Sequence, residues 1–326
     1  MFWNSNQFNV DGKLVIITGA SQGLGLALAK AAFSKGADVI IIARREAILQ
    51  AAVADIEKFR SSTTQNLSYI AADISIASEA ERVIAETGRA PDVLMCCAGS
   101  AIPKLFIELT TDELTSGVAT NYFTALYMAH AGLKAMAKSP VPSYCRHIVL
   151  FSSAVHFYSF IGYSQYAPAK SALRSLGDCL RHECLPYNIK VDVIFAGNFL
   201  SEGYTIENLT KPEITKKIEG PSKPITADEC ADKIIRQLDK GNQMITTDFI
   251  GLVLSSMMLS CSPRINYLGQ TCLAIVLAIF APVWEWLVVK DIRKFYKDRS
   301  MAASQAVPLS AKDGDDDNIT NHGAED

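Results

Sequence analysis

The sequence predicts an α/β protein with a doubly wound parallel sheet, helices on both faces of the sheet, and apolar helices at the C-terminal end. Short apolar runs rich in β-branched residues, such as Asp38–Ala43, alternate with longer segments of helical periodicity. This alternation is typical of parallel strands joined by helices. A glycine-rich turn joins the first strand to the first helix, and the C-terminal third of the 326 residues is unusually apolar. A chain of this length can bury a sizeable core.

The first predicted strand, residues 13–17, leads directly into the glycine-rich turn. Gly19, Gly23 and Gly25 follow the spacing G-x-x-x-G-x-G, and a strong helical pattern begins within the turn. Strand, glycine turn and helix form the setting in which a Rossmann-type fold binds a dinucleotide. Gly19 and Gly23 would let the backbone approach the pyrophosphate, and Gly25 would permit close packing of the helix. The same turn contributes three further predicted cofactor residues, Ser21, Gln22 and Leu24.

The end of the second strand predicts which nicotinamide cofactor is bound. A carboxylate at this position would bind the ribose 2′-hydroxyl and repel a 2′-phosphate. Arg44 and Arg45 follow Asp38–Ala43 instead, and a guanidinium can bind a phosphate bidentately and stack on adenine. We therefore predict that the cofactor is NADPH. The alternative is that the two arginines only begin a solvated helix.

A second set of polar residues, Ser153, Tyr166 and Lys170, predicts carbonyl reduction. Tyr166 and Lys170 are four residues apart, so on a helix they share a face and the Lys170 ammonium can lie near the phenol. That charge would lower the phenol pKa from about 10 towards neutral pH. A tyrosine with a lowered pKa can donate a proton to a ketone while hydride is transferred to the ketone carbon. The four-residue spacing is common on helix surfaces, so the prediction depends on the glycine turn upstream.

The variant glycine spacing and these three residues together resemble the short-chain dehydrogenase/reductase family, over roughly the first 200 residues of the chain. The resemblance implies that Ser153 holds the ketone oxygen and that Tyr166 donates the proton. It also implies that Lys170 binds the nicotinamide ribose, so Tyr166 and Lys170 belong to the cofactor site as well. Adjacent strand residues point to opposite faces, so the neighbouring Ser152 is expected to pack or to bond to backbone.

The same resemblance adds residues on either side of this set. Asp73 matches the acidic residue that contacts adenine, and Ile74 beside it is predicted to belong to the same part of the cofactor site. Asn121 matches the asparagine that holds a water in a proton relay to the catalytic lysine. The alternative is a helix asparagine bonded to backbone. Cys96 and Cys97 stand where the family usually has two asparagines, which removes an amide but keeps the following turn.

Three segments resemble one branch of the family, the fungal 3-ketodihydrosphingosine reductases: CCAGSAIPKLF, FIGYSQYAPAKSALRSL and GNFLSEGYTIENLTKPEITKKIEGPS. The third falls in the lid expected at about residues 199–226. The resemblance implies NADPH-dependent reduction of the long-chain keto-amine 3-ketodihydrosphingosine (3-ketosphinganine) to dihydrosphingosine (sphinganine) in sphingolipid synthesis. One alternative is another lipid-directed reductase, acting on a steroid, retinoid or 3-oxoacyl group. The other is a nucleotide-binding scaffold without catalysis, although a scaffold would not need Ser153, Tyr166 and Lys170.

Composition and charge exclude several other classes of protein. The net charge is −3 and no basic patch is visible, so we expect no nucleic-acid binding. The eight cysteines form no C-x-x-C pair or Cys/His cluster, so we expect no metal and reduced, cytosolic thiols. The opening residues lack the basic and apolar regions of a secretory signal.

Three parts are expected along the chain: a catalytic domain over residues 1–241, a membrane-associating segment over 242–299 and a disordered acidic tail over 300–326. The apolar stretch 249–261 is short for a bilayer span, whereas 267–289 is long enough and carries Trp284 and Trp286 as interface anchors. Pro282 and Glu285 count against a plain spanning helix. The alternative is an apolar helix that caps the core or forms a dimer face.

The basic run over residues 290–297 favours the membrane interpretation, because it suits a cytosolic anionic surface. Since NADPH is cytosolic, we expect a protein of the endoplasmic reticulum membrane whose catalytic domain faces the cytosol. Both chain ends stay on that side if the two apolar stretches form a re-entrant hairpin with residues 262–266 as its turn, or if both stretches cross. The family resemblance also leaves a homodimer open.

Overall fold

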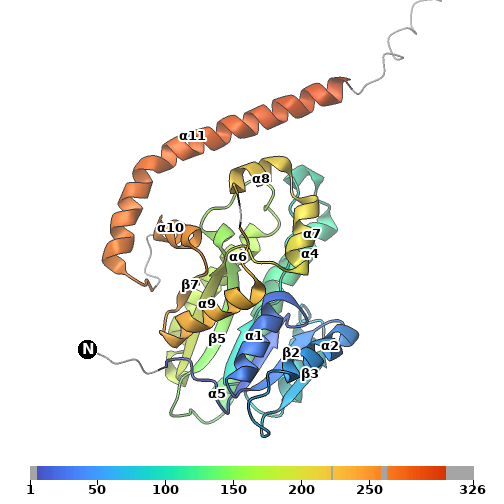
Figure 1. Ribbon diagram of the computed structural model, residues 1–326, viewed down its shortest axis with the longest axis vertical. Helices are drawn as coiled ribbons and strands as arrows, with labels where there is room; N and C mark the ends of the chain where they lie inside the picture. Colours follow the sequence, from blue (N-terminus) through green and yellow to red (C-terminus); the bar gives the residue numbers. More distant parts are fainter. Residues whose placement is uncertain (1–5, 222, 258–262, 306–326) are drawn as a thin grey trace, which may run out of the picture. The chain divides into compact units, whose positions relative to one another are not determined.

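The computed structural model describes residues 6–221, 223–257 and 263–305. Within these ranges, seven parallel strands form one sheet in the order β3-β2-β1-β4-β5-β6-β7 (Figure 1). The strands are β1 (Leu14–Thr18), β2 (Asp38–Ala43), β3 (Leu67–Ala71), β4 (Val93–Cys96), β5 (Arg146–Ser153), β6 (Ile189–Ala196) and β7 (Met244–Thr246). The predicted α/β class with a doubly wound parallel sheet is confirmed, and β2 has the predicted bounds.

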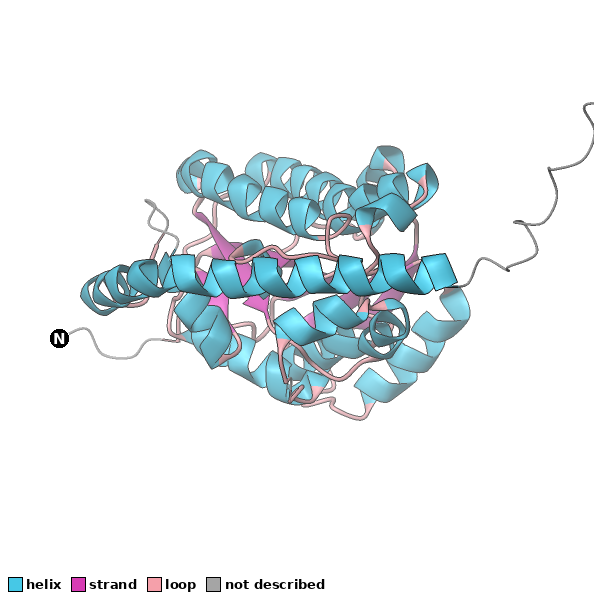
Figure 2. Ribbon diagram, turned by 90° about the horizontal axis from the view of Figure 1, so that it is seen from above, coloured by secondary structure: helices cyan, strands magenta, loops and turns pink. Residues whose placement is uncertain are grey.

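Helices cover both faces of this sheet, as Figure 2 shows from above. Alternate residues of β1 divide between two cores, with Val15 and Ile17 in one and Leu14 and Ile16 in the other. The first core is completed by α1 (Gly23–Ser34), α2 (Glu46–Glu57) and α9 (Ala227–Asp239). The second is completed by α3 (Ala77–Glu86), α5 (Thr124–Lys138) and α6 (Ala167–Glu183). Shorter elements are α4 (Thr111–Val118) and the turns η1 (Phe106–Glu108), η2 (Ala119–Phe123), η3 (Ala154–His156) and η4 (Leu185–Tyr187).

The strand order changes direction between β1 and β4. From β1 the chain proceeds outward through β2 and β3, and it then returns to β4 on the other side of β1. In open sheets of this kind, ligands bind outside the carboxyl ends of the strands at such a switch point. Thr18 and Cys96 are register partners at the ends of β1 and β4, and β5 continues past Leu150, the partner of Cys96, to Ser153. The predicted site residues therefore follow the edge where a ligand is expected.

The predicted lid contains two short helices, α7 (Glu202–Thr210) and α8 (Glu213–Glu219). The two ends of this segment meet, because Phe199 and Ile225 form an isolated parallel bridge. The N–H of Leu200 donates to the carbonyl of Ile225 at 2.8 Å. The lid therefore leaves the core and returns to it at one place.

Beyond residue 241 the chain still contributes to the sheet. β7 pairs with β6, so the sheet continues past the expected end of the catalytic domain. Two helices follow, α10 (Phe249–Met257) and α11 (Tyr267–Gln305). α11 includes residues 300–305, where we expected the tail to begin; the rest of that tail lies outside the described residues. The chain divides into two compact units, and the second begins at Phe280 within α11.

α11 is long and apolar enough to cross a membrane. Its segment Tyr267–Arg299 contains an 18-residue window with a mean hydropathy of 2.3, and only 11% of that window is buried. Its length and composition therefore suit the membrane-associating segment expected here. The helix continues through Pro282, which membrane-spanning helices tolerate better than soluble ones.

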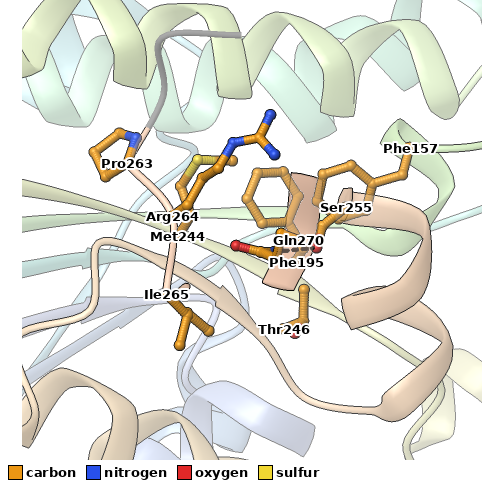
Figure 3. A pocket seen from close by; sticks show the side chains of 9 residues that line it. All are labelled: Phe157, Phe195, Met244, Thr246, Ser255, Pro263, Arg264, Ile265 and Gln270. Atoms are coloured by element: carbon orange, nitrogen blue, oxygen red, sulfur yellow. Dashed lines mark hydrogen bonds between the residues drawn. The ribbon is translucent and has the colours of Figure 1, made fainter. Parts of the chain in front are cut away.

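A small pocket lies where the start of α11 approaches α10 (Figure 3). Phe157, Phe195 and Met244 line it from the catalytic fold, and the side-chain amide of Gln270 donates to the Ser255 hydroxyl at 3.5 Å across it. The predicted catalytic residues do not line this pocket. The turn 262–266 of the expected hairpin falls partly outside the described residues.

Candidate active site

Ser153 and Tyr166 meet where β5 ends and α6 begins. Ser153 is the last residue of β5, and Tyr166 immediately precedes the first helical residue of α6. Pro168 in the first turn of α6 suits a helix start, because its missing N–H would have no helical partner there. The Ser153 hydroxyl and the Tyr166 phenol are hydrogen-bonded. The Lys170 N–H donates to the Tyr166 carbonyl at 3.1 Å, so the predicted helical turn between these two residues is present.

Ser152 points away from this pair, as predicted. Its hydroxyl donates to the Lys170 carbonyl at 2.8 Å, and its side chain is buried. The bond ties β5 to the first turn of α6, which fixes the spacing between strand and helix. Ser152 therefore has a structural partner, and Ser153 is the serine that contacts the tyrosine.

Lys170 is buried, with 4% of its surface exposed. Its ammonium donates to the Phe151 carbonyl at 2.8 Å and lies 5.4 Å from the centre of the Tyr166 ring. Burial lowers the Lys170 pKa to about 8, because a charged ammonium loses hydration there. Lys170 is thus still mainly protonated at neutral pH.

The Tyr166 pKa differs from our expectation. We expected Lys170 to lower it, but burial raises it above its ordinary value, and the negative charge of Glu207 raises it further. The hydrogen bond with Ser153 acts in the opposite direction. The Lys170 ammonium instead donates to the Phe151 carbonyl and lies 5.4 Å from the centre of the Tyr166 ring. The sequence could not predict this, since both the burial and the position of Glu207 are tertiary features.

Asn121 lies fully buried in η2, a single π-helical turn between α4 and α5. Its amide donates to the carbonyls of Ser100 and Gly117 at 2.8 and 3.0 Å and accepts from the Ser100 N–H at 3.0 Å. These bonds agree with the backbone-bonded alternative. A β-carbon on Gly99 would lie 2.8 Å from the Asn121 oxygen and 3.0 Å from the Lys170 ammonium. Asn121 and Lys170 therefore both lie against Gly99.

The glycine turn has the shape that a dinucleotide needs. Gly19 and Gly23 have φ values of +67° and +57°, a region that favours glycine. A β-carbon on Gly19 would lie 2.7 Å from the Ala98 Cα, and one on Gly25 would lie 2.5 Å from the Gly19 carbonyl oxygen. Gln22 makes no side-chain cap at the start of α1, so the first N–H groups of that helix remain for a phosphate. The residues present fit a dinucleotide.

The structure brings the predicted phosphate-binding residues next to this turn. A guanidinium N–H of Arg45 donates to the side-chain oxygen of Gln22 at 3.2 Å. The Asp73 pKa is lowered by hydrogen bonds from Ser75 and also by the positive charge of Arg44. The Ile74 side chain is buried in the core, so only its backbone could face a cofactor. Arg45 thus contacts the turn, and Arg44 lies near Asp73.

The sequence analysis missed a charged cluster in the lid. Lys211 pairs with Glu207 at 3.0 Å and with Glu219 at 2.7 Å, and the Tyr163 hydroxyl donates to Glu207. The four-residue spacing of Glu207 and Lys211 was a weak signal of one of these pairs. Glu219 and Tyr163 come from other elements, so only the folded chain shows them together.

Comparison with known proteins identifies the class. The family described as short chain dehydrogenase matches residues 13–209, more than half of the chain. The chain therefore belongs to the short-chain dehydrogenase/reductase family, whose members are oxidoreductases that use a nicotinamide cofactor. A short-chain dehydrogenase/reductase from Burkholderia phymatum solved with NAD is 16% identical, with a TM-score of 0.63 over 79% of this chain and 99% of that one. A putative gluconate dehydrogenase from Agrobacterium tumefaciens is 23% identical, with a TM-score of 0.64 over 77% and 99%. At these low sequence identities, the similarity to the two solved structures shows a shared fold only.

Curated relatives narrow the comparison to one kind of enzyme. The chain is 45% identical over 293 residues to the 3-ketodihydrosphingosine reductase TSC10 of Yarrowia lipolytica, covering 88% of this chain and 79% of that one. It is 43% identical over 312 residues to the protein of the same name from Debaryomyces hansenii, covering 92% and 94%. It is 38% identical to the 3-ketodihydrosphingosine reductase ksrA of Aspergillus fumigatus, covering 82% and 80%.

Proposed function

We propose that this protein reduces 3-ketodihydrosphingosine to dihydrosphingosine with NADPH in sphingolipid synthesis. The observation that carries the proposal is the hydrogen-bonded Ser153 and Tyr166 with Lys170 one turn away, at the strand ends where the family binds its cofactor. The reductases named above resemble the chain over most of its length, including the lid. The substrate is taken from the names of these relatives.

The proposed chemistry divides among the three residues. Ser153 donates a hydrogen bond to the ketone oxygen, and Tyr166 transfers its phenolic proton to that oxygen. NADPH, when bound, supplies the hydride that adds to the ketone carbon. A raised Tyr166 pKa suits this direction of reaction, because the phenol is protonated at neutral pH before substrate is reduced. Lys170, mainly charged at pH 7, stabilises the phenolate that remains and binds the nicotinamide ribose.

Arg44 and Arg45 support NADPH over NADH. Both follow β2 at the position where an acidic residue would select NADH, and Arg45 is held beside the glycine turn by Gln22. A 2′-phosphate placed there would gain charge-assisted hydrogen bonds, each stronger than a bond between neutral groups. We assign the adenine side of the site to Asp73 and the Ile74 backbone, and the pyrophosphate to the turn itself.

We also propose that α11 attaches the enzyme to the endoplasmic reticulum membrane, with the catalytic domain on the cytosolic side. Its exposed residues include Phe280, Trp284 and Trp286, which suit the hydrocarbon and the interface. A substrate with a long alkyl chain partitions into lipid, so an enzyme at the bilayer receives it without carrying the chain through water.

Product analysis tests the proposed function. The full-length protein in mixed micelles would be supplied with NADPH and, in parallel, with 3-ketodihydrosphingosine, a steroid ketone, a retinal and a 3-oxoacyl thioester. Mass spectrometry should detect dihydrosphingosine, and it should form fastest. Preferred turnover of another ketone would replace the substrate assignment, and no turnover of any of them would favour the scaffold alternative.

A further inference from the structure

The lid contains two acidic side chains that share one cation. Lys211 pairs with Glu207 at 3.0 Å and with Glu219 at 2.7 Å. The Lys211 side chain is 1% exposed, and each of the glutamates is 17% exposed. We refer to Glu207, Lys211 and Glu219 as the lid cluster. It joins α7 to α8 through charges that are largely shielded from water.

The charges of the lid cluster do not balance. Two carboxylates and one ammonium leave one negative charge, and a poorly hydrated charge is unfavourable without a partner. The Tyr163 hydroxyl donates to Glu207, and the Asn198 amide donates to Glu219 at 2.6 Å. These neutral donors stabilise the carboxylates without cancelling the charge. Among the described residues, Lys211 is the only cation within ion-pair distance of these two glutamates.

The excess charge acts on the proposed catalytic residues. Glu207 raises the pKa of both Tyr163 and Tyr166, whereas Glu219 acts on Tyr163 only. The Tyr163 and Tyr166 rings lie 6.0 Å apart, and the Tyr163 hydroxyl donates to Glu207. Glu207 is thus the member of the lid cluster whose charge reaches the phenol that faces the ketone.

We propose that Glu207 binds the protonated amine of the substrate, and that this contact selects amino ketones over other lipid ketones. The inference rests on the proposed function, because in 3-ketodihydrosphingosine the amine is on the carbon next to the ketone. An ammonium at that position brings one positive charge to the side of Tyr166 where the lid cluster has one negative charge in excess. Steroid, retinoid and 3-oxoacyl ketones carry no such cation.

The same contact would couple substrate choice to acid strength. Glu207 opposes loss of the Tyr166 proton by its negative charge. A bound ammonium offsets that charge, so the phenol becomes a stronger acid when an amino ketone is present. A neutral ketone in the same place leaves Glu207 uncompensated and the phenol a weaker acid. Glu207 therefore affects both the binding of the substrate and the proton transfer to it.

Two matched ketones test the inference. The first is 3-ketodihydrosphingosine, and the second is the same hydroxy ketone without the amine. We compare kcat/KM for both in the wild type, Glu207→Gln, Glu207→Asp and the control Glu213→Gln. Glu213 lies on the same lid, is exposed and pairs only with Lys216 among the described residues. The ratio of kcat/KM for the amino ketone to that for its neutral counterpart cancels general effects of a substitution on the lid.

The ratio should fall roughly tenfold or more in Glu207→Gln, as expected for loss of a charge-assisted hydrogen bond. Glu207→Asp keeps the charge and should recover part of the ratio, and Glu213→Gln should keep the wild-type ratio. An equal loss of kcat/KM on both ketones in Glu207→Gln would mean that Glu207 has a purely structural role. That result would overturn this inference but leave the proposed function in place. Failure of the wild type to reduce 3-ketodihydrosphingosine would instead overturn the proposed function, and the inference with it.

Inhibition of the wild type gives a second test that needs no variant. Octadecylamine should inhibit at roughly tenfold lower concentration than octadecanol, because only the amine carries the charge that Glu207 binds. Equal inhibition by the two compounds would overturn the inference even if Glu207→Gln fails to fold.

Discussion

Replacing Lys170 by methionine should abolish catalysis and yet stabilise the fold at neutral pH. The Lys170 pKa falls from 10.5 to about 8 through burial. At about 1.4 kcal/mol for each tenfold change, this corresponds to roughly 3 kcal/mol of destabilisation while the side chain is charged. Methionine removes the destabilisation caused by the buried charge. It also leaves the Phe151 carbonyl without its hydrogen-bond donor, which costs about 1 to 2 kcal/mol. We expect a net gain of about 1 to 2 kcal/mol at pH 7.

The pH dependence gives the sharper test, and its sign follows from the direction of the shift. The folded chain has the lower Lys170 pKa, so between about pH 8 and pH 10.5 the unfolded chain binds more protons. The destabilisation is fully present below pH 8 and is lost as the pH rises towards 10.5. The advantage of Lys170→Met over the wild type should therefore shrink across this window and be lost at its upper end.

Circular dichroism during denaturant unfolding in detergent, at pH 7 and near pH 10, measures both stabilities. Lys58→Met is the control, because Lys58 is exposed and should show no such change in relative stability. A Lys170→Met variant that is less stable than the wild type at pH 7, or whose relative stability is the same at both pH values, would refute the reasoning.

Three other predictions concern the proton donor, the cofactor and the membrane. Tyr166→Phe should fold and bind NADPH normally while turnover falls roughly 100-fold or more; near wild-type turnover would exclude Tyr166 as the acid. Arg44→Ala and Arg45→Ala should each raise the KM for NADPH about tenfold or more and leave that for NADH nearly unchanged, whereas an equal rise for both cofactors would contradict the phosphate assignment. The protein should resist carbonate extraction, and added protease should digest tags at both ends in sealed microsomes; a protected C-terminal tag would contradict the hairpin and favour a single crossing.

Local patterns were sufficient to predict most of the fold. The β-branched run Asp38–Ala43 and the turn around Gly19 are fixed by neighbouring residues, so strand β2 and the glycine turn could be anticipated. β7 has only three residues, too few for a pattern, and its pairing with β6 becomes visible only in the sheet. The boundary expected at residue 241 missed this strand for that reason.

The sequence predicted the spacing of the candidate site residues but not their surroundings, and the roles assigned to these residues stay predictions. The spacing of Tyr166 and Lys170 was correct because one helical turn joins them. The direction of the Tyr166 pKa shift was wrong because it depends on burial and on Glu207, which reaches the tyrosine from a different element. Short sequence motifs carry no information on charged residues, such as Glu207, that the folded lid brings near Tyr166 from a distant part of the sequence.

The bridge between Phe199 and Ile225 brings the two ends of the lid together at one place. Segments anchored at two distant points resist transplantation, because both anchors must match the new host. Here the two ends are neighbours, so residues 199–226 could be exchanged between related reductases if the backbone bridge and the side-chain contacts to Tyr163 and Ile161 are kept. Substrate preference in this family could thus diversify by replacement of one contiguous peptide while the cofactor-binding half stays unchanged.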